Sequence, residues 1–372
     1  MLKSKLLSGR EPALYPADLM IKNAQFQRRC CQAFYGILIV LASATAAWAR
    51  STAAPYLSRS GDWFRSADGL RIATNILSWQ DLYGSWPKNT NTTDFPFAGD
   101  RHTIQGTFDN EATTDEMRFL ARAYNATNIP AFKESFGQGL DCILKAQYPT
   151  GGWPQSYPPD QQYHRRITFN DDAMVRVLLF IRDVATNQQA RFGFVDAERR
   201  QAAARSFDRG IECILKCQVV VDGKKTVWCA QHDEMDYAPR IGRSYELPSL
   251  SGSESAGILE LLMSLDHPSP QIIAAINSGA AWFEKSKING IRIRVVNGDR
   301  QVEQDPAAPP LWARFYEIDT NRPFFSGRDG VKKYAFSEIE AERRNGYSWY
   351  GNWGAKILQD YPKWKSARGI KN

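Results

Sequence analysis

The sequence has few residues of the two types that build zinc sites. Its 372 residues include four histidines and six cysteines, and none of them lies in the two acidic loops described below, Thr107–Thr113 and Thr168–Met174. A metal bound at these loops would therefore have to be held by oxygen atoms. Four of the cysteines follow residue 49: Cys142, Cys213, Cys217 and Cys229. Cys213 and Cys217 lie in a helical pattern, where they suit an apolar core as well as a disulfide, so their pairing stays open.

Long apolar runs are also missing, with one exception near the start of the chain. Arg28 and Arg29 precede the apolar run Ala33–Ala47, which is followed by an Ala-Trp-Ala sequence ending at Ala49. This order is typical of a secretory signal, so residues 1–49 are predicted to be a leader, with Met20 as an alternative start. A membrane span needs about 20 apolar residues, and residues 50–372 contain no such run. The sequence therefore predicts an exported protein, secreted or periplasmic, with no membrane segment in its mature form.

The mature chain lacks a strong charge of either sign. The predicted leader holds six of the 47 basic residues and two of the 40 acidic ones, which leaves 41 basic and 38 acidic residues and a net charge of +3. A nearly neutral domain is not expected to bind nucleic acid through its overall charge. No linker or low-complexity tract interrupts residues 50–372, so we expect these residues to form one large catalytic domain.

What the mature chain does contain is an internal repeat. Ile76–Pro87 and Ile143–Pro154 share Ile-Leu, Gln, Gly and Trp-Pro at the same offsets, and Gly210–Trp228 is a third copy with a short insertion. Each copy ends an amphipathic helix at a Gly-Trp corner. Repeated helical hairpins with one apolar face can bury those faces around a common axis. The sequence therefore predicts a fold dominated by α-helices, an incomplete α/α toroid of about three helical hairpin repeats with a few short strands.

Helical periodicity and strand signals fill in the elements between the corners. Apolar residues recur at helical spacing, each run following a potential Asp, Asn or Ser cap, over Glu111–Tyr124, Asp172–Val184 and Glu254–Leu265. Strand signals are sparse. They occur at Thr226–Gln231 and at Ile291–Gln304, where an Asn-Gly pair predicts a hairpin turn.

Two acidic loops repeat each other before two of these helices. The sequence TFDNEAT at Thr107–Thr113 is echoed by TFNDDAM at Thr168–Met174, so equivalent residues should lie side by side in the repeat. One interpretation is helix capping. The other is a cation site, because each loop carries more carboxylate and amide oxygens than one cap requires. With no His or Cys in reach, these oxygens favour Ca²⁺ over Zn²⁺.

Arginines and tryptophans suggest what such a site would bind. Five arginines stand in turn-rich segments: Arg240, Arg243, Arg314, Arg322 and Arg328. Each one alone fits a surface or salt-bridge role, but beside a cation site the set describes a pocket for a polycarboxylate. The corner residues Trp86 and Trp153 could be platforms for sugar rings, although tryptophan at a repeated position also suits the core.

At these residues the sequence resembles the pectate lyases of polysaccharide lyase family 10. The resemblance covers nearly all of the mature chain and runs through Gly151–Pro158, Ile167–Met174, Trp228–Met235, Arg243–Ser255, Trp312–Gly330 and Gly346–Trp353. It implies a monomeric, secreted enzyme that cleaves polygalacturonate by Ca²⁺-dependent β-elimination on an incomplete helical toroid.

The resemblance also implies roles for particular residues. The calcium ligands would be Asp109, Asn110 and Asp171. The catalytic base would be Arg243, with Arg240 as the alternative. The substrate-clamping arginine would be Arg328, with Arg314 as its neighbour. Tyr245 and the corner residue Trp153 are further candidates for substrate binding. For arginine to act as a base its pKa must fall, which we expect neighbouring cations and calcium to cause in the complex.

Three other functions compete with this interpretation. Terpene cyclases share the Gln, Gly and Trp corner repeat, but they use an apolar cavity and would not need these arginines. A glycoside hydrolase on the same toroid would use two carboxylates and give saturated products. A non-catalytic pectin-binding protein would bind polygalacturonate without cleaving it.

Overall fold

The chain separates into two units, Met1–Ala49 and Arg50–Asn372. The computed structural model describes residues 51–370, so the predicted leader lies outside the described residues and stays a prediction. Within residues 51–370, no helix is long and apolar enough to cross a membrane.

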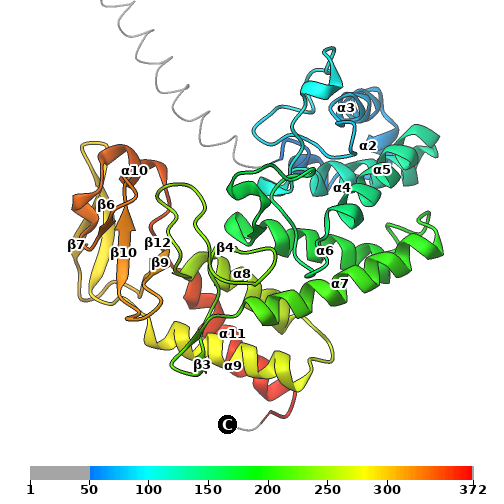
Figure 1. Cartoon of the computed structure of the whole chain (residues 1–372). Coiled ribbons are helices and arrows are strands. Elements are labelled where there is room, and N and C mark those ends of the chain that lie inside the picture. The colour runs from blue at the N-terminus through cyan, green and yellow to red at the C-terminus, as the bar shows by residue number, and fades with distance from the viewer. Residues whose placement is uncertain (1–50, 371–372) are drawn as a thin grey trace, which may run out of the picture. The chain divides into compact units, whose positions relative to one another are not determined.

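Helices dominate the described part of the chain, as predicted, and most of them are arranged in antiparallel pairs (Figure 1). The α-helices are α2 (Gly61–Arg65), α3 (Ala67–Ser78), α4 (Thr114–Thr127), α5 (Pro130–Ala146), α6 (Ala173–Thr186), α7 (Ala197–Cys217), α8 (Gly252–Met263), α9 (Pro270–Lys285), α10 (Ala341–Gly346) and α11 (Trp353–Ala367). Four pairs pack as hairpins: α2 with α3, α4 with α5, α6 with α7, and α8 with α9. Neighbouring hairpins contact one another through α4, α6 and α8 and through α5, α7 and α9, and α11 covers the last hairpin.

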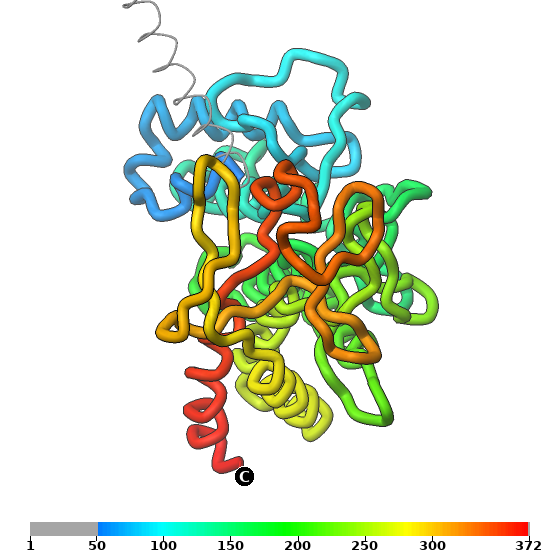
Figure 2. Tube along the Cα trace, turned by 90° about the vertical axis from the view of Figure 1, so that its left-hand side faces the viewer, coloured from blue at the N-terminus to red at the C-terminus, as the bar shows by residue number. Residues whose placement is uncertain are grey.

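The strands are short and gather mostly at one end of this unit, beside α10 (Figure 1). They are β1 (Ile167–Thr168), β2 (Val220–Val221), β3 (Lys224–Lys225), β4 (Gln231–His232), β5 (Leu250–Ser251), β6 (Ile291–Val296), β7 (Asp299–Gln304), β8 (Trp312–Ala313), β9 (Phe315–Tyr316), β10 (Pro323–Ser326), β11 (Lys332–Lys333) and β12 (Tyr350–Gly351). The largest sheet has the order β11, β10, β9, β5. The predicted hairpin is confirmed as β6 and β7, and it projects as a long loop in Figure 2. The predicted strand Thr226–Gln231 is wrong, because only Gln231 belongs to a strand.

A tryptophan closes each hairpin in the same way. Its indole N–H donates to a carbonyl near the end of the preceding helix, over 2.7–2.9 Å, in the pairs Trp86 to Ile76, Trp153 to Ile143, Trp228 to Ile214 and Trp312 to Phe283. The fourth pair has no counterpart in the predicted repeat. The β6–β7 hairpin separates Trp312 from its helix in sequence, which hides this copy from a search for fixed spacing.

Two apolar cores hold the unit together. The larger core lies among the helices. The four cysteines of residues 51–370 are buried and unpaired, with the Cys213 and Cys217 sulfurs 4.0 Å apart. The smaller core lies among the short strands and includes Tyr245, Phe315 and Tyr347. This second core supports the arginines described below.

Candidate active site

The two echoed loops lie in contact with each other. They form the 3-10 turns η3 (Asp109–Glu111) and η5 (Asn170–Asp172), each running into an inner helix. Two consecutive residues in each turn have left-handed backbones, with φ of 53° and 65° at Asn110 and Glu111 and of 50° and 62° at Asp171 and Asp172. Non-glycine residues adopt this conformation at an energetic cost, and such strain concentrates at functional sites.

The capping interpretation of these loops is wrong. The residues that precede α4 and α6 are Thr113 and Asp172, and neither side chain accepts a capping hydrogen bond. Ser251 before α8 makes none either. The carboxylates and amides of the loops are therefore free for other partners.

A hydrogen-bond ladder holds each loop against the next corner. The backbone N–H of Phe108 donates to the carbonyl of Gln155 and that of Phe169 to the carbonyl of Ala230, both over 2.9 Å. Gly252 donates to Arg314 in the same way, also over 2.9 Å. Gln155, Ala230 and Arg314 each stand two residues after a corner tryptophan, and Lys88 has this place after Trp86. We call these four the post-tryptophan positions.

In the first loop, Asp109 meets two of the post-tryptophan side chains. Its Oδ2 accepts from Lys88 Nζ over 2.5 Å and from Gln155 Nε2 over 2.8 Å. Its Oδ1 is buried and has no partner in the described residues. The adjacent Asn110 side chain makes no hydrogen bond there. Among the described residues, the first loop therefore presents two buried carboxylate oxygens without a hydrogen-bond partner, Asp109 Oδ1 and Glu111 Oε2, and one free amide.

In the second loop, Asp171 meets a buried arginine. Its Oδ1 accepts from Arg314 over 2.8 Å and its Oδ2 from Asn170 over 2.8 Å. Arg314 also donates to buried Glu254. Burial alone would raise the pKa of Asp171, but the positive charges of Arg314 and Arg243 lower it below its ordinary value. In the second loop, guanidinium groups thus keep the Asp171 carboxylate ionised.

Arg243 lies close enough to Asp171 to affect its pKa, but its direct partner is Glu246. A guanidinium N–H of Arg243 donates to Glu246 Oε1 over 2.5 Å. Burial works to lower the pKa of Arg243, yet the ion pair with Glu246 holds it well above its ordinary value. In the described arrangement Arg243 is therefore charged, and the lowering of its pKa, expected in the complex with calcium and substrate, stays a prediction.

Aromatic rings fix the two guanidinium groups. Tyr347 lies 4.6 Å from the Arg314 guanidinium and 5.5 Å from that of Arg243, and its hydroxyl donates to Glu246 over 2.8 Å. Tyr245, predicted to bind substrate, is buried between Arg243 at 5.0 Å and Arg343 at 4.7 Å. Cation–π contacts of this kind orient arginine without neutralising it. Tyr245 therefore positions Arg243 rather than offering an open ring face.

The prediction of Trp153 as a substrate platform is wrong. Its ring is fully buried, and its N–H is used by Ile143, as described above. Trp86 is buried in the same manner. A large ring that closes a repeated corner is needed for packing, so no face of it remains for a sugar.

Arg328 is not brought into contact with the other predicted residues. Its side chain is 64% exposed and pairs with Glu342 over 2.9 Å. Glu342 also pairs with Arg343, which stacks on Tyr245. Arg328 is thus linked to Arg243 only through this chain of side chains.

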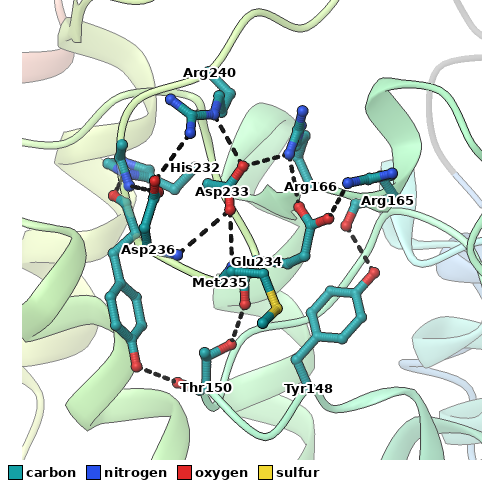
Figure 3. A network of polar contacts seen from close by, with 12 residues as sticks. Tyr148, Thr150, Arg165, Arg166, His232, Asp233, Glu234, Met235, Asp236 and Arg240 are labelled. Carbon is teal, nitrogen blue, oxygen red and sulfur yellow. Dashed lines mark hydrogen bonds and ion pairs between the residues drawn. The ribbon is translucent and has the colours of Figure 1, made fainter.

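Arg240, the alternative base, belongs to a separate polar network (Figure 3). It pairs with Asp233 over 2.9 Å and with Asp236 over 3.0 Å. Asp233 also accepts from Arg166 over 2.6 Å, and the Glu234 carbonyl accepts from Thr150 over 2.8 Å. This network ties three loops together and leaves Arg240 without a contact to either acidic turn, so the geometry favours Arg243 over Arg240.

Buried His232 supports the same network. Its Nε2 accepts from the Cys229 N–H over 3.1 Å, and its Nδ1 lies 2.7 Å from the Tyr237 carbonyl. Burial lowers its pKa to about 4. A neutral histidine with both nitrogens engaged is a structural residue.

The oxygen atoms at the two turns fit a hard cation. Among residues 51–370, no group of three or more His, Cys, Asp or Glu side chains forms a metal cluster. Asp109, Asn110 and Asp171 instead supply two carboxylates and one amide, with Asp109 Oδ1 unpartnered. Such a set suits Ca²⁺ by its chemistry. Because it is sparse and Asp171 is shared with Arg314, additional oxygens would have to come from Glu111, whose buried Oε2 is also unpartnered in the described residues, from water or from a ligand.

Sequence reasoning missed several residues of this site: Lys88, Gln155, Glu246, Glu254 and Tyr347. Lys88 and Gln155 carried a usable signal, because both occupy post-tryptophan positions. Glu246, Glu254 and Tyr347 carried none, because their partners are distant in sequence or revealed only by packing.

Taken together, the fold and the site define a class of enzyme. A helical-hairpin repeat that sets carboxylates against the guanidinium groups of the buried Arg314 and the partly exposed Arg243 suits a polyanionic substrate. The family described as pectic acid lyase matches residues 80–358. The chain belongs to this family and is a family 10 polysaccharide lyase.

Two solved structures are similar to the chain. Both are of the family 10 polysaccharide lyase from Cellvibrio cellulosa, and one is a point mutant in complex with trigalacturonic acid. The mutant is 34% identical, with a TM-score of 0.74, over 84% of this chain and 97% of that one. The other is 35% identical, with a TM-score of 0.74, over 84% and 96%. No curated protein matches the chain.

Proposed function

We propose that the protein cleaves polygalacturonate by β-elimination, with calcium bound at Asp109, Asn110 and Asp171 and with Arg243 as the base. The products would be oligogalacturonides with a 4,5-unsaturated end. Family membership and the trigalacturonic acid bound to the Cellvibrio enzyme support the substrate. The observation that carries the mechanism is the contact of the two strained acidic turns beside Arg314 and Arg243.

The electrostatics of the site match what elimination requires. Removal of H5 from a uronate is difficult while the neighbouring carboxylate keeps its negative charge. A calcium ion bound at the two turns would supply positive charge to that carboxylate. Arg314 is committed to Asp171 and Glu254, so its role is to keep Asp171 ionised. Arg328 is exposed, so it could exchange Glu342 for a substrate carboxylate.

For Arg243 to accept a proton, its ion pair with Glu246 must weaken. Substrate and cation would bring new charge beside Arg243, and release from Glu246 would lower its pKa toward the range of a base. The rate should therefore rise into alkaline pH. Replacing Glu246 by Gln removes the stabilising negative charge, so the alkaline rise should move to lower pH. An unchanged pH profile in Glu246→Gln would contradict this account.

A direct test compares two arginine variants. Arg243→Ala should abolish the ultraviolet absorbance gain of the unsaturated product, whereas Arg240→Ala, outside the site, should retain turnover in proportion to the protein that remains folded. The assay uses polygalacturonate with added Ca²⁺ or EDTA. Turnover that persists in Arg243→Ala would refute the base assignment.

The same assay separates the competing functions. Saturated products would indicate a hydrolase, and binding of polygalacturonate without product in excess Ca²⁺ would indicate a binding protein. We also propose that the four hairpins form an incomplete toroid and that the mature protein is exported as a monomer.

A further inference from the structure

A cleft of about 660 Å³ opens beside the first acidic turn. This volume falls within the range of roughly 300–1,000 Å³ typical of ligand pockets, so it has room for more than one sugar ring. Lys88 and Gln155 line the cleft and are the two residues that donate to Asp109. The cleft therefore adjoins the candidate cation site through Lys88 and Gln155.

Lys88 is the cleft cation best placed to meet a substrate carboxylate. Its side chain is 33% exposed, whereas that of Asp109 is 4% exposed. The cleft carboxylates already have partners. Both oxygens of Asp81 are bonded to groups of its own turn, and Asp160 pairs with His164 over 2.6 Å. An anionic ligand would thus meet a lysine whose one partner, Asp109, also belongs to the cation site.

Aromatic rings line the same cleft. Tyr83 is 55% exposed and meets Tyr157 edge to face at 6.1 Å. Trp79 lies nearby, half-buried, with its N–H donating to the Phe95 carbonyl over 2.8 Å. The contact with Tyr157 holds the Tyr83 ring in place, and more than half of the Tyr83 side chain stays exposed. Such rings suit the apolar faces of sugars.

We infer that this cleft is a further uronate-binding subsite, in which Lys88 binds a carboxylate of the same polysaccharide chain and Tyr83 and Tyr157 contact its rings. The inference rests on the proposed function and deepens it. Lys88 would exchange Asp109 for the substrate carboxylate, so the occupied subsite would release Asp109 Oδ2 toward the cation site. Chain binding in the cleft and completion of the cation site would then be coupled.

The test measures binding of oligogalacturonates of increasing length by calorimetry, in an Arg243→Ala background that suppresses turnover. Lys88→Met should weaken binding of long oligomers by about tenfold, since a charge-assisted contact is lost. Lys88→Arg is the matched control and should retain most of the affinity. Tyr83→Ala should weaken binding by about threefold, and Tyr83→Phe, which keeps the ring, should not.

Fully methyl-esterified oligomers sharpen the assignment. They lack the carboxylate, so the Lys88→Met effect should disappear with them while the Tyr83→Ala effect remains. Long oligomers that bind Lys88→Met and Tyr83→Ala as tightly as their parent, at unchanged melting temperature, would overturn the subsite. The proposed function fails differently: the wild-type protein would then give no unsaturated product from polygalacturonate.

Discussion

The two acidic turns share a pair of left-handed residues but have different neighbours. Asp109 of the first turn is held by Lys88 and Gln155, which border an open cleft. Asp171 of the second turn is held by Arg314, which is buried with Glu254. Of these four neighbours, Lys88, Gln155 and Arg314 occupy post-tryptophan positions, and Glu254 does not. The repeat therefore supplies one scaffold for two carboxylates, and the residue placed after each tryptophan makes one turn open to exchange and the other fixed.

The largest expected effect comes from removing the positive charge beside each turn, Arg314 or Lys88. Arg314→Met should destabilise the fold by about 3–5 kcal/mol, because it leaves the fully buried Glu254 and the partly exposed Asp171 without their counter-charge. Lys88→Met should cost about 1 kcal/mol or less, because water can reach its place beside Asp109. Urea unfolding of both variants measures the difference. Equal losses of unfolding free energy in the two variants would show that the different burial of Arg314 and Lys88 does not distinguish the two turns.

A second prediction concerns the helices that follow the turns. Position 116 of α4 is a glutamate, and the equivalent position of α6 is Val177; both side chains are buried. Burial raises the pKa of Glu116 from 4.5 to about 7, although Ser51 donates to it over 2.7 Å. The folded state thus binds this proton more tightly than the unfolded state. Stability should fall as pH rises from about 4.5 to about 7, by roughly 3 kcal/mol.

Glu116→Gln should make the fall of stability with pH shallower, because α4 would then carry a residue that does not titrate at this position, as α6 does with Val177. Unfolding midpoints between about pH 4 and pH 8 measure the slope. Asp68→Asn removes an exposed acid on α3 and serves as the control, which should keep the wild-type slope. A wild-type slope in Glu116→Gln would assign the pH dependence to other acids.

The smallest effect concerns the glutamine at three of the corners. Gln80 Oε1 accepts from Ser135 and Gln147 Oε1 from Ser206, both over 2.7 Å. Gln218 has Ala275 in the equivalent place, and its Oε1 is buried without a partner in the described residues. Ser135→Ala should destabilise by about 1–2 kcal/mol, and Ala275→Ser should stabilise by up to about 1 kcal/mol. Thermal unfolding checks both, and a destabilised Ala275→Ser would show that the third corner has no room for the hydroxyl.

Much of the site was accessible from sequence because it follows the repeat. The contact between the turns of Asp109 and Asp171 was predicted from the echo of two seven-residue segments, and the structure places them together. The role of Trp153 was misjudged because the sequence does not record whether an aromatic ring is open or packed. The assignment of Tyr245 to substrate binding stays a prediction. Only burial separates Trp153, which closes a corner, from Tyr83, which stands in a cleft.

By itself the sequence determined the helical hairpins, the echoed turns and the oxygen-rich chemistry of the site, because apolar periodicity and repetition are local properties of the chain. The tertiary structure alone decided which cation meets which carboxylate, and that Glu246 holds Arg243 charged. Those contacts join segments far apart along the chain or depend on ring packing and desolvation, and the strength of an ion pair depends on burial, which no local pattern records.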